Sequence, residues 1–92
     1  MTIVREEWKG GGRWVMVVDG HEAEMTYTRN SPTVIQIDHT GVPEPVRARG
    51  IGQALVEQAV ADARREGFRI VPVCSFAEAQ FRRHPKWRDV LA

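Results

Sequence analysis

The sequence predicts an α/β (α+β) domain: a mixed, mostly antiparallel sheet of about four strands with two helices, in the order β-β-β-α-β-α. Three observations support this prediction. Residues 14–40 contain three β-forming runs joined by short turns, which predicts an antiparallel meander. Residues 51–66 change to a helical period and end at Gly67. The β-forming run FRIVPV then completes a strand–helix–strand crossover, which favours a strand parallel to an earlier one.

The first two strands are predicted to form a hairpin. Asp19-Gly20 separates WVMVV from HEAEMTYT and is a favoured two-residue turn. Residues alternate along the second of these strands, so the side chains expected on one face are those of His21, Ala23, Met25 and Tyr27. In the third strand, TVIQIDH, the same alternation predicts one face shared by Ile35, Ile37 and His39.

A stiff loop is predicted after the third strand, because Pro43 and Pro45 each lack a backbone donor. The following helix presents an apolar face formed by Ile51, Leu55, Val56, Ala59, Val60 and Ala63. The second helix, SFAEAQFRRH, is expected to be capped by Ser75 and halted by Pro85, and KWRDVLA to add a last helical turn. The aromatic residues expected in the core are Trp14, Tyr27, Phe68, Phe76, Phe81 and Trp87.

Length and composition predict one domain. The chain has 92 residues, of which residues 1–12, with three consecutive glycines, are expected to be a flexible N-terminal lead-in to a domain at 13–92. The net charge of +1 gives no reason to expect nucleic acid or a membrane as a partner. The single cysteine excludes an internal disulfide. With no bilayer-length apolar run and a polar N-terminus, we expect a cytoplasmic protein.

The segment RARGIG stands where the first helix begins. A helix start exposes unpaired N–H groups and carries partial positive charge, and Gly50 and Gly52 allow an anion close to the backbone. Arg47 and Arg49 add full charges, so these are the parts of a phosphate or pyrophosphate site. Leu55 excludes the dinucleotide fingerprint GxGxxG, and the Walker lysine is absent. These residues alone also fit an ordinary helix start with solvated arginines.

RARGIG fits the pattern (Q/R)xxGx(G/A), which binds the coenzyme A pyrophosphate in GNAT-superfamily acetyltransferases. The chain resembles the short GNAT-like N-acetyltransferases of the YjdJ type from about Gly12 to Leu91. The resemblance rests on five segments in order: VDGHEAEMTY, IDHTGVP, RARGIGQALV, VPVCSF and RRHPKW. It implies a compact GNAT-like fold and a transferase that moves an acetyl group from acetyl-CoA to an amine of a small molecule or a protein lysine, without a metal. The residues that it implies at the coenzyme are Val46, Arg47, Ala48, Arg49, Gly50, Ile51, Gly52 and Gln53.

Two residues are candidates for the reacting end. The resemblance places a cysteine at the position of Cys74, where it is a transient acetyl acceptor, a proton relay or a lining residue; the alternative is a small buried apolar side chain. We favour a place at the cofactor site over covalent catalysis. His39 suits a general base, or equally a strand-end histidine held by the backbone. His84 is expected to stabilise a helix end, but its matched segment RRHP also makes it a candidate near the coenzyme.

Two departures from the resemblance leave alternatives open. Many GNAT acetyltransferases carry a tyrosine on the second helix to protonate the departing thiolate, whereas the nearest place here is Gln80, beside Phe81. This favours, as an alternative, a non-catalytic acyl-CoA-binding or sensing module. The chain is also short, so we expect an acceptor pocket that is shallow or is completed by another chain in a homo-oligomer. Glu22 and Glu24 are candidates to attract a cationic amine, or simply solvated residues. A purely structural or interaction domain ranks last, because it leaves the five ordered segments unexplained.

Overall fold

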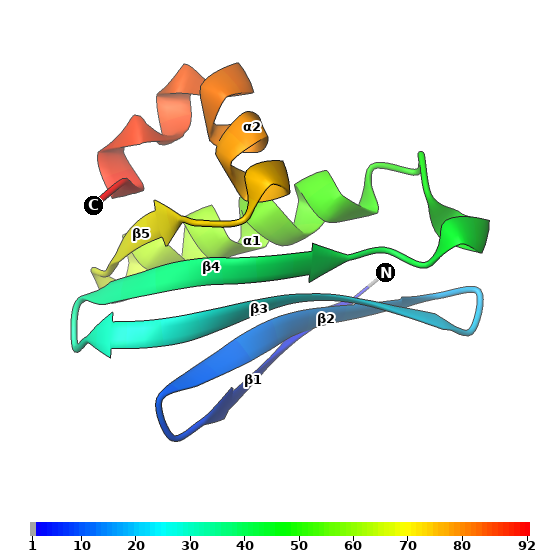
Figure 1. The fold of residues 1–92 in the computed structure, drawn as a ribbon, viewed down its shortest axis with the longest axis horizontal. Helices are drawn as coiled ribbons and strands as arrows, with labels where there is room; N and C mark the ends of the chain where they lie inside the picture. Colours follow the sequence, from blue (N-terminus) through cyan, green and yellow to red (C-terminus); the bar gives the residue numbers. More distant parts are fainter. Residues whose placement is uncertain (1) are drawn as a thin grey trace.

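The computed structural model describes residues 2–92 and contains one five-stranded sheet with two α-helices (Figure 1). The strands are β1 (Ile3–Trp8), β2 (Gly11–Val18), β3 (His21–Ser31), β4 (Val34–Gly41) and β5 (Arg69–Pro72), in that spatial order. The helices are α1 (Ile51–Glu66) and α2 (Ser75–Arg83), with 3₁₀ turns at Glu44–Val46 and Pro85–Val90. Strands β1 to β4 are antiparallel and β5 runs parallel to β4, which confirms the predicted mixed sheet with two helices.

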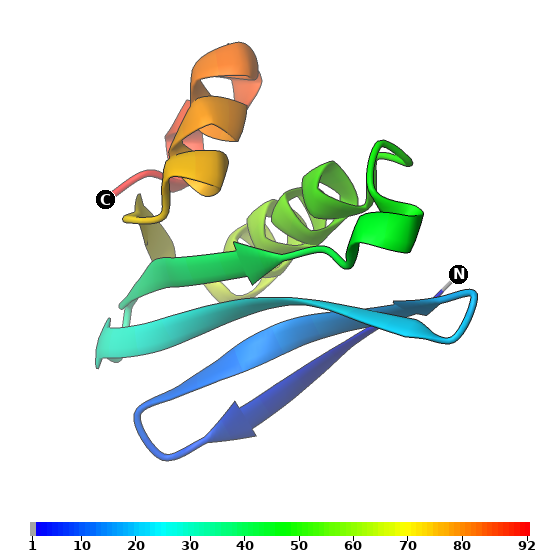
Figure 2. The same cartoon turned by 45° about the vertical axis from the view of Figure 1, so that its right-hand side comes forward.

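The predicted hairpin between β2 and β3 is confirmed. Asp19 and Gly20 both have positive φ, at 50° and 78°, as a tight turn of this kind requires. The alternation along β3 buries Ala23, Met25 and Tyr27 on one face. That face forms the core with the apolar side of α1, which packs against β2 and β3 along the sheet (Figures 1 and 2).

The expectation of a flexible lead-in over residues 1–12 is wrong, because Ile3–Trp8 form strand β1. Every residue of β1 pairs with β2, from Ile3 opposite Met16 to Trp8 opposite Gly11. Met1 lies outside the described residues. The run IVREEW reads as polar and mobile in the sequence, yet its alternation turns Ile3 and Arg5 toward the helix-covered side of the sheet. The sheet therefore has one strand more than expected.

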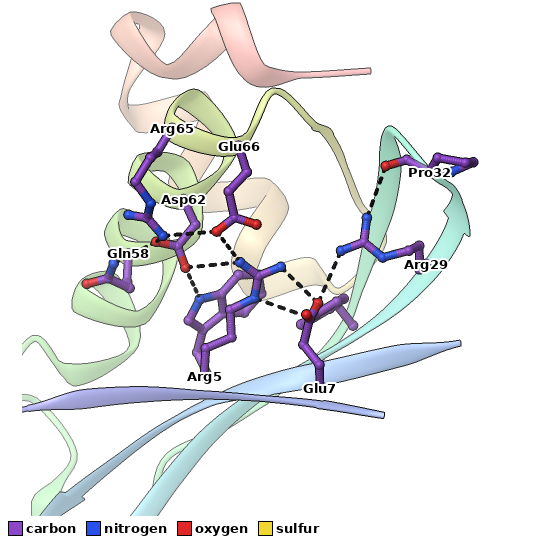
Figure 3. A network of polar contacts seen from close by, with 10 residues as sticks. Arg5, Glu7, Arg29, Pro32, Gln58, Asp62, Arg65 and Glu66 are labelled. Carbon is purple, nitrogen blue, oxygen red and sulfur yellow. Dashed lines mark hydrogen bonds and ion pairs between the residues drawn. The ribbon is translucent and has the colours of Figure 1, made fainter. Parts of the chain in front are cut away.

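A partly buried polar network joins β1 to α1 (Figure 3). The guanidinium of Arg5 donates to Glu66 Oε2 at 2.6 Å and to Tyr27 Oη at 3.2 Å, and it lies 3.6 Å from Asp62 Oδ2. Asp62, only 3% exposed, accepts hydrogen bonds from Trp14 Nε1 at 2.8 Å and Gln58 Nε2 at 2.9 Å. Arg5 thereby ties the edge strand to the last turns of the helix.

The Asp62 carboxylate stays ionised in this buried place. Burial alone would raise the pKa of Asp62, but hydrogen bonds from Trp14, Gln58 and Arg65 outweigh burial and hold that pKa below its ordinary value. The folded state therefore favours the charged carboxylate, which links folding to pH.

A β-bulge in β4 corrects the expected position of His39. Thr26 lies opposite His39 whereas Tyr27 lies opposite Ile37, so Asp38 is one extra residue on β4. An extra residue moves the following side chains to the other face. His39 therefore does not share the face of Ile35 and Ile37, and Thr40, opposite Met25, takes the core-facing place instead.

Helix α2 differs from expectation at its start. Cys74, and not Ser75, is the N-cap, because Cys74 Sγ accepts a hydrogen bond from the Ala77 N–H at 3.3 Å. Phe76 is not a core residue: it is 39% exposed and faces the start of α1. Phe81 is buried as expected and contacts Trp87 edge to face, at 5.8 Å between ring centroids.

Candidate active site

A cavity of about 780 Å³ lies at the end of β4. One wall is formed by the end of β4 and the loop after it, and the others by the start of α1 and by α2, with Glu22 and Glu24 of β3 at its rim. Its size falls in the range of small-molecule and cofactor sites, about 300–1,000 Å³. The cavity is thus the best candidate for the functional site.

The cavity lies where β4 and β5 part. The two strands are paired from Val34–Arg69 to Ile37–Pro72, and β5 ends there while β4 continues to Gly41. The N–H groups of Val73 and Cys74 both donate to Ile37 O, at 3.1 and 3.0 Å, and hold the chain at the point of divergence. Beyond this point the end of β4 and helix α2 both line the opening.

The start of α1 faces this cavity without a cap. Gly50 is the N-cap residue, with a φ of +75° that favours glycine, and no side chain among residues 2–92 caps the helix. The first N–H groups of a helix have no partner within it, so those of Ile51, Gly52 and Gln53 are available to a ligand. Their partial positive charge suits an anion.

Gly52 allows the close approach of α2 to α1. A Cβ at this position would lie 2.5 Å from the ring of Phe76, so only glycine fits the ring as placed. Both residues line the cavity. Phe76 thus forms an apolar wall beside the N–H groups, a contact that the sequence pattern did not reveal.

The structure places the two arginines of RARGIG differently. Arg47 lines the cavity, and its Nε donates to Val42 O at 3.0 Å, which holds the guanidinium on the loop. Arg49 does not line the cavity and pairs with Asp19 in the hairpin turn at 2.6 Å. Ala48, at a φ of +66°, lines the cavity between them, whereas the side chain of Val46 is buried in the core. Arg47 is therefore the one arginine of RARGIG that lines the cavity.

The bulge places His39 at the cavity, where two glutamates form an acidic rim. His39 is exposed and lines the cavity together with Glu22 and Glu24 of the neighbouring strand. Arg13 bonds both glutamates, at 3.1 and 2.8 Å, and also Glu6, at 2.7 Å. The single guanidinium of Arg13 thus pairs with three carboxylates. The rim of Glu22 and Glu24 therefore keeps a net negative charge beside His39.

Cys74 lies behind the cavity wall. Its Sγ is 3.4 Å from Thr40 Oγ1, and Thr40, unlike Cys74, lines the cavity. Sequence reasoning missed Thr40, because the bulge that turns it inward has no clear sequence signal. The thiol is therefore connected to the cavity through the threonine hydroxyl.

The remaining predicted residues divide between the cavity and the helix end. Gln80 lines the cavity from α2. His84 does not: its Nδ1 lies 2.8 Å from Gln80 O and its ring stacks on Trp87 at 3.9 Å. Its assignment to the coenzyme stays a prediction. The chain's one tyrosine, Tyr27, donates to Glu7 at 2.6 Å within the β1 network, away from the cavity.

Residues 2–92 contain neither a membrane-spanning helix nor a cluster of metal-binding side chains. No helix there is long and apolar enough to cross a bilayer. The same residues bring together no group of three or more His, Cys, Asp or Glu side chains that could hold a metal ion.

Comparisons with known proteins agree with this fold. The family model of the GCN5-related N-acetyltransferases matches residues 13–90. The fold is similar to the NMR solution structure of a GCN5-like proposed N-acetyltransferase from Staphylococcus aureus, with a TM-score of 0.73 and 27% sequence identity. That match covers 97% of this chain and 87% of the other, and it confirms the GNAT-like fold class. With its parted strands, uncapped helix start and matching family model, the chain belongs to the GCN5-related N-acetyltransferase family.

Proposed function

We propose that this protein transfers an acetyl group from acetyl-CoA to an amine of a small molecule or of a protein lysine. The observation that carries the proposal is one cavity that joins two chemically different ends. The end that we assign to the diphosphate is the uncapped start of α1 with Arg47, and the end that we assign to the amine is His39 with Glu22 and Glu24, all of which line the cavity. A donor with a diphosphate and a long thioester arm matches the first end, and a cationic amine matches the second.

The residues at the first end fit the coenzyme. The diphosphate would accept hydrogen bonds from the N–H groups of Ile51, Gly52 and Gln53, with Arg47 adding a full positive charge. The arm would then follow the parting strands past Phe76 toward the other face of β4. Oriented amides and a guanidinium supply the counter-charge, so we propose no metal for the diphosphate.

At the second end the amine must lose a proton and attack. Acetyl-CoA supplies the acetyl group and the thiol leaving group: the new amide bond forms as the carbon–sulfur bond breaks. We assign to His39 the acceptance of the amine proton, because it is exposed at the cavity beside the acidic rim. Glu22 and Glu24 would attract the protonated form of the amine before reaction. Holding both partners in line supplies a further part of the acceleration.

Among residues 2–92, no tyrosine side chain lines the cavity. The departing thiolate must therefore take its proton from another group or from water. This observation keeps the second candidate function, a non-catalytic acyl-CoA-binding module, as an outcome of the test. Mass spectrometry of polyamines and lysine peptides incubated with the protein and acetyl-CoA should show acetylated products. Binding of acetyl-CoA without acetylation of any acceptor would favour the second function.

The two arginines should differ in a calorimetric titration with acetyl-CoA. Arg47→Ala is expected to weaken affinity by about tenfold or more, because it removes a charge-assisted hydrogen bond. Arg49→Ala, the matched control, is expected to change it by less than about threefold, since Arg49 forms an exposed ion pair outside the cavity. Absence of binding by the parent protein would remove the proposed function. Equal losses in the two variants would contradict the role given to Arg47.

Replacing Cys74 by serine tests whether the thiol is a nucleophile. Serine is a good N-cap and keeps a hydroxyl beside Thr40, so we expect Cys74→Ser to retain turnover within about tenfold of the parent. Cys74→Ala, which removes the cap, should lower the free energy of unfolding by about 1 kcal/mol. An acetyl adduct on Cys74 in the parent, together with loss of turnover in the serine variant, would instead show covalent catalysis.

A further inference from the structure

Gln80 has a buried polar atom without a partner. The residue is 5% exposed, and its side chain lines the cavity from α2. Its amide oxygen Oε1 is the one fully buried side-chain nitrogen or oxygen among residues 2–92 that lacks a hydrogen bond. Buried polar groups in folded proteins are nearly always paired, so an unpaired one at a cavity wall points to a partner that the free chain does not supply.

The backbone around Gln80 holds this side chain in place. The backbone oxygen of Gln80 lies 2.8 Å from His84 Nδ1, and its neighbour Phe81 is buried in the core. One turn earlier on α2, Phe76 packs on Gly52 at the start of α1. Gln80 and Phe76 therefore form one wall of the cavity, on the side of the helix start.

The chemistry of an amide oxygen restricts the partner to a hydrogen-bond donor. An anion such as the diphosphate offers acceptors only and would be repelled by this oxygen. The acceptor amine is a donor, but the groups suited to it, His39 and Glu24, lie on the other face of β4. The arm between diphosphate and thioester carries secondary amides, whose N–H groups are donors of the required kind. As placed, Oε1 has almost no accessible surface, and a ligand reaches it only when the terminal amide turns, a rotation that is broad in glutamine.

We propose that Gln80 Oε1 accepts a hydrogen bond from an amide N–H of the thioester-carrying arm and so positions the arm between the parted strands. This inference rests on the proposed function and adds to it a residue that selects for the amide-containing arm. Gln80 then holds the place of the absent phenol without donating a proton, which makes it a binding residue.

The test uses Gln80→Met, which keeps the length of the side chain and removes its polar group. Two ligands are titrated by calorimetry: acetyl-CoA, and the nucleotide diphosphate part of coenzyme A without its arm. We expect the variant to bind acetyl-CoA about tenfold more weakly, because an arm N–H loses its acceptor, and to bind the nucleotide as the parent does. Its midpoint of chemical unfolding in the absence of ligand should be equal or higher, because a buried unpaired oxygen is removed.

Gln58→Met is the matched control on α1. Gln58 donates to Asp62 at 2.9 Å and does not line the cavity, so this variant should lose stability and keep its affinity for both ligands. Unchanged acetyl-CoA affinity in Gln80→Met would overturn the inference and leave the proposed function standing. Failure of Gln80→Met to fold, or equal loss of affinity for both ligands, would also overturn it. If the parent binds neither ligand, the proposed function fails together with the inference.

Discussion

Replacement of Asp62 by asparagine is expected to lower the free energy of unfolding by about 2 kcal/mol, because buried donors lose their charged acceptor. The carboxylate accepts from Trp14, Gln58 and Arg65 in a place that is 3% exposed, and an asparagine side chain there would offer one acceptor oxygen in place of two. Arg5 keeps Glu66 as a partner, which limits the loss. The free energy of unfolding of a small domain is only about 5–15 kcal/mol in total, so the effect should be evident in urea denaturation followed by circular dichroism.

The matched control is Asp89→Asn, which makes the same chemical change at the surface. Asp89 pairs with Arg64 at 2.8 Å while both side chains are about half exposed, so its loss should cost less than about 1 kcal/mol. Similar losses in the two variants would show that the Asp62 network contributes no more than a surface pair.

The same carboxylate makes stability depend on pH. Because the pKa of Asp62 is lower in the folded state than in the unfolded state, its contribution is present above an ordinary aspartate pKa of about 4 and is lost as the pH falls through the folded value. The parent should therefore lose stability below about pH 4 more steeply than the Asp62→Asn variant. Parallel pH profiles for the two proteins would contradict the lowered pKa.

Replacement of His39 by glutamine is expected to lower kcat by about a hundredfold or more, the usual effect of removing a general base. Glutamine keeps polar atoms at the cavity but does not accept the amine proton at neutral pH. The affinity for acetyl-CoA should stay within about twofold, since the proposed diphosphate site is formed by the start of α1 and Arg47 and does not include His39. The assay uses an acceptor that the polyamine and lysine-peptide panel identifies.

His21→Gln serves as the control for this change. His21 opens β3 and does not line the cavity, so its variant should retain the kcat of the parent. A His39→Gln variant with unchanged kcat would remove the general base from the mechanism, and a parallel loss in His21→Gln would point to a general effect on the sheet.

Much of the fold followed from patterns that are local in the sequence. The Asp19-Gly20 turn, the alternation of β3 and the apolar side of α1 each depend on residues a few positions apart. Strand β1 was missed because its run is mostly polar and because the Lys9-Gly10 turn that pairs it with β2 reads as part of a flexible glycine stretch. Long-range contacts of Arg5 with Asp62 and Glu66 then hold the strand against α1. No local pattern in IVREEW announces these partners.

The site was predicted at its helix end and less well at its reacting end. RARGIG carries its own signal, so the start of α1 and Arg47 were predicted at the coenzyme from the sequence; in the structure both line the cavity, and their role in binding stays a prediction. His39 and Thr40 depend on the extra residue Asp38, which reverses the expected faces of β4. The separate place of Arg49 depends on Asp19, thirty positions earlier in the chain, which no spacing rule could supply.

The central claim is that the unpaired N–H groups at the start of α1 bind the diphosphate of acetyl-CoA. Amide resonances of the isotope-labelled protein, recorded by NMR during titration with acetyl-CoA, test it residue by residue. We expect the largest shifts at Ile51, Gly52 and Gln53, with Gly20 in the hairpin turn unchanged. Unchanged resonances at Ile51, Gly52 and Gln53 while the ligand binds elsewhere, or no shift at any residue, would contradict it.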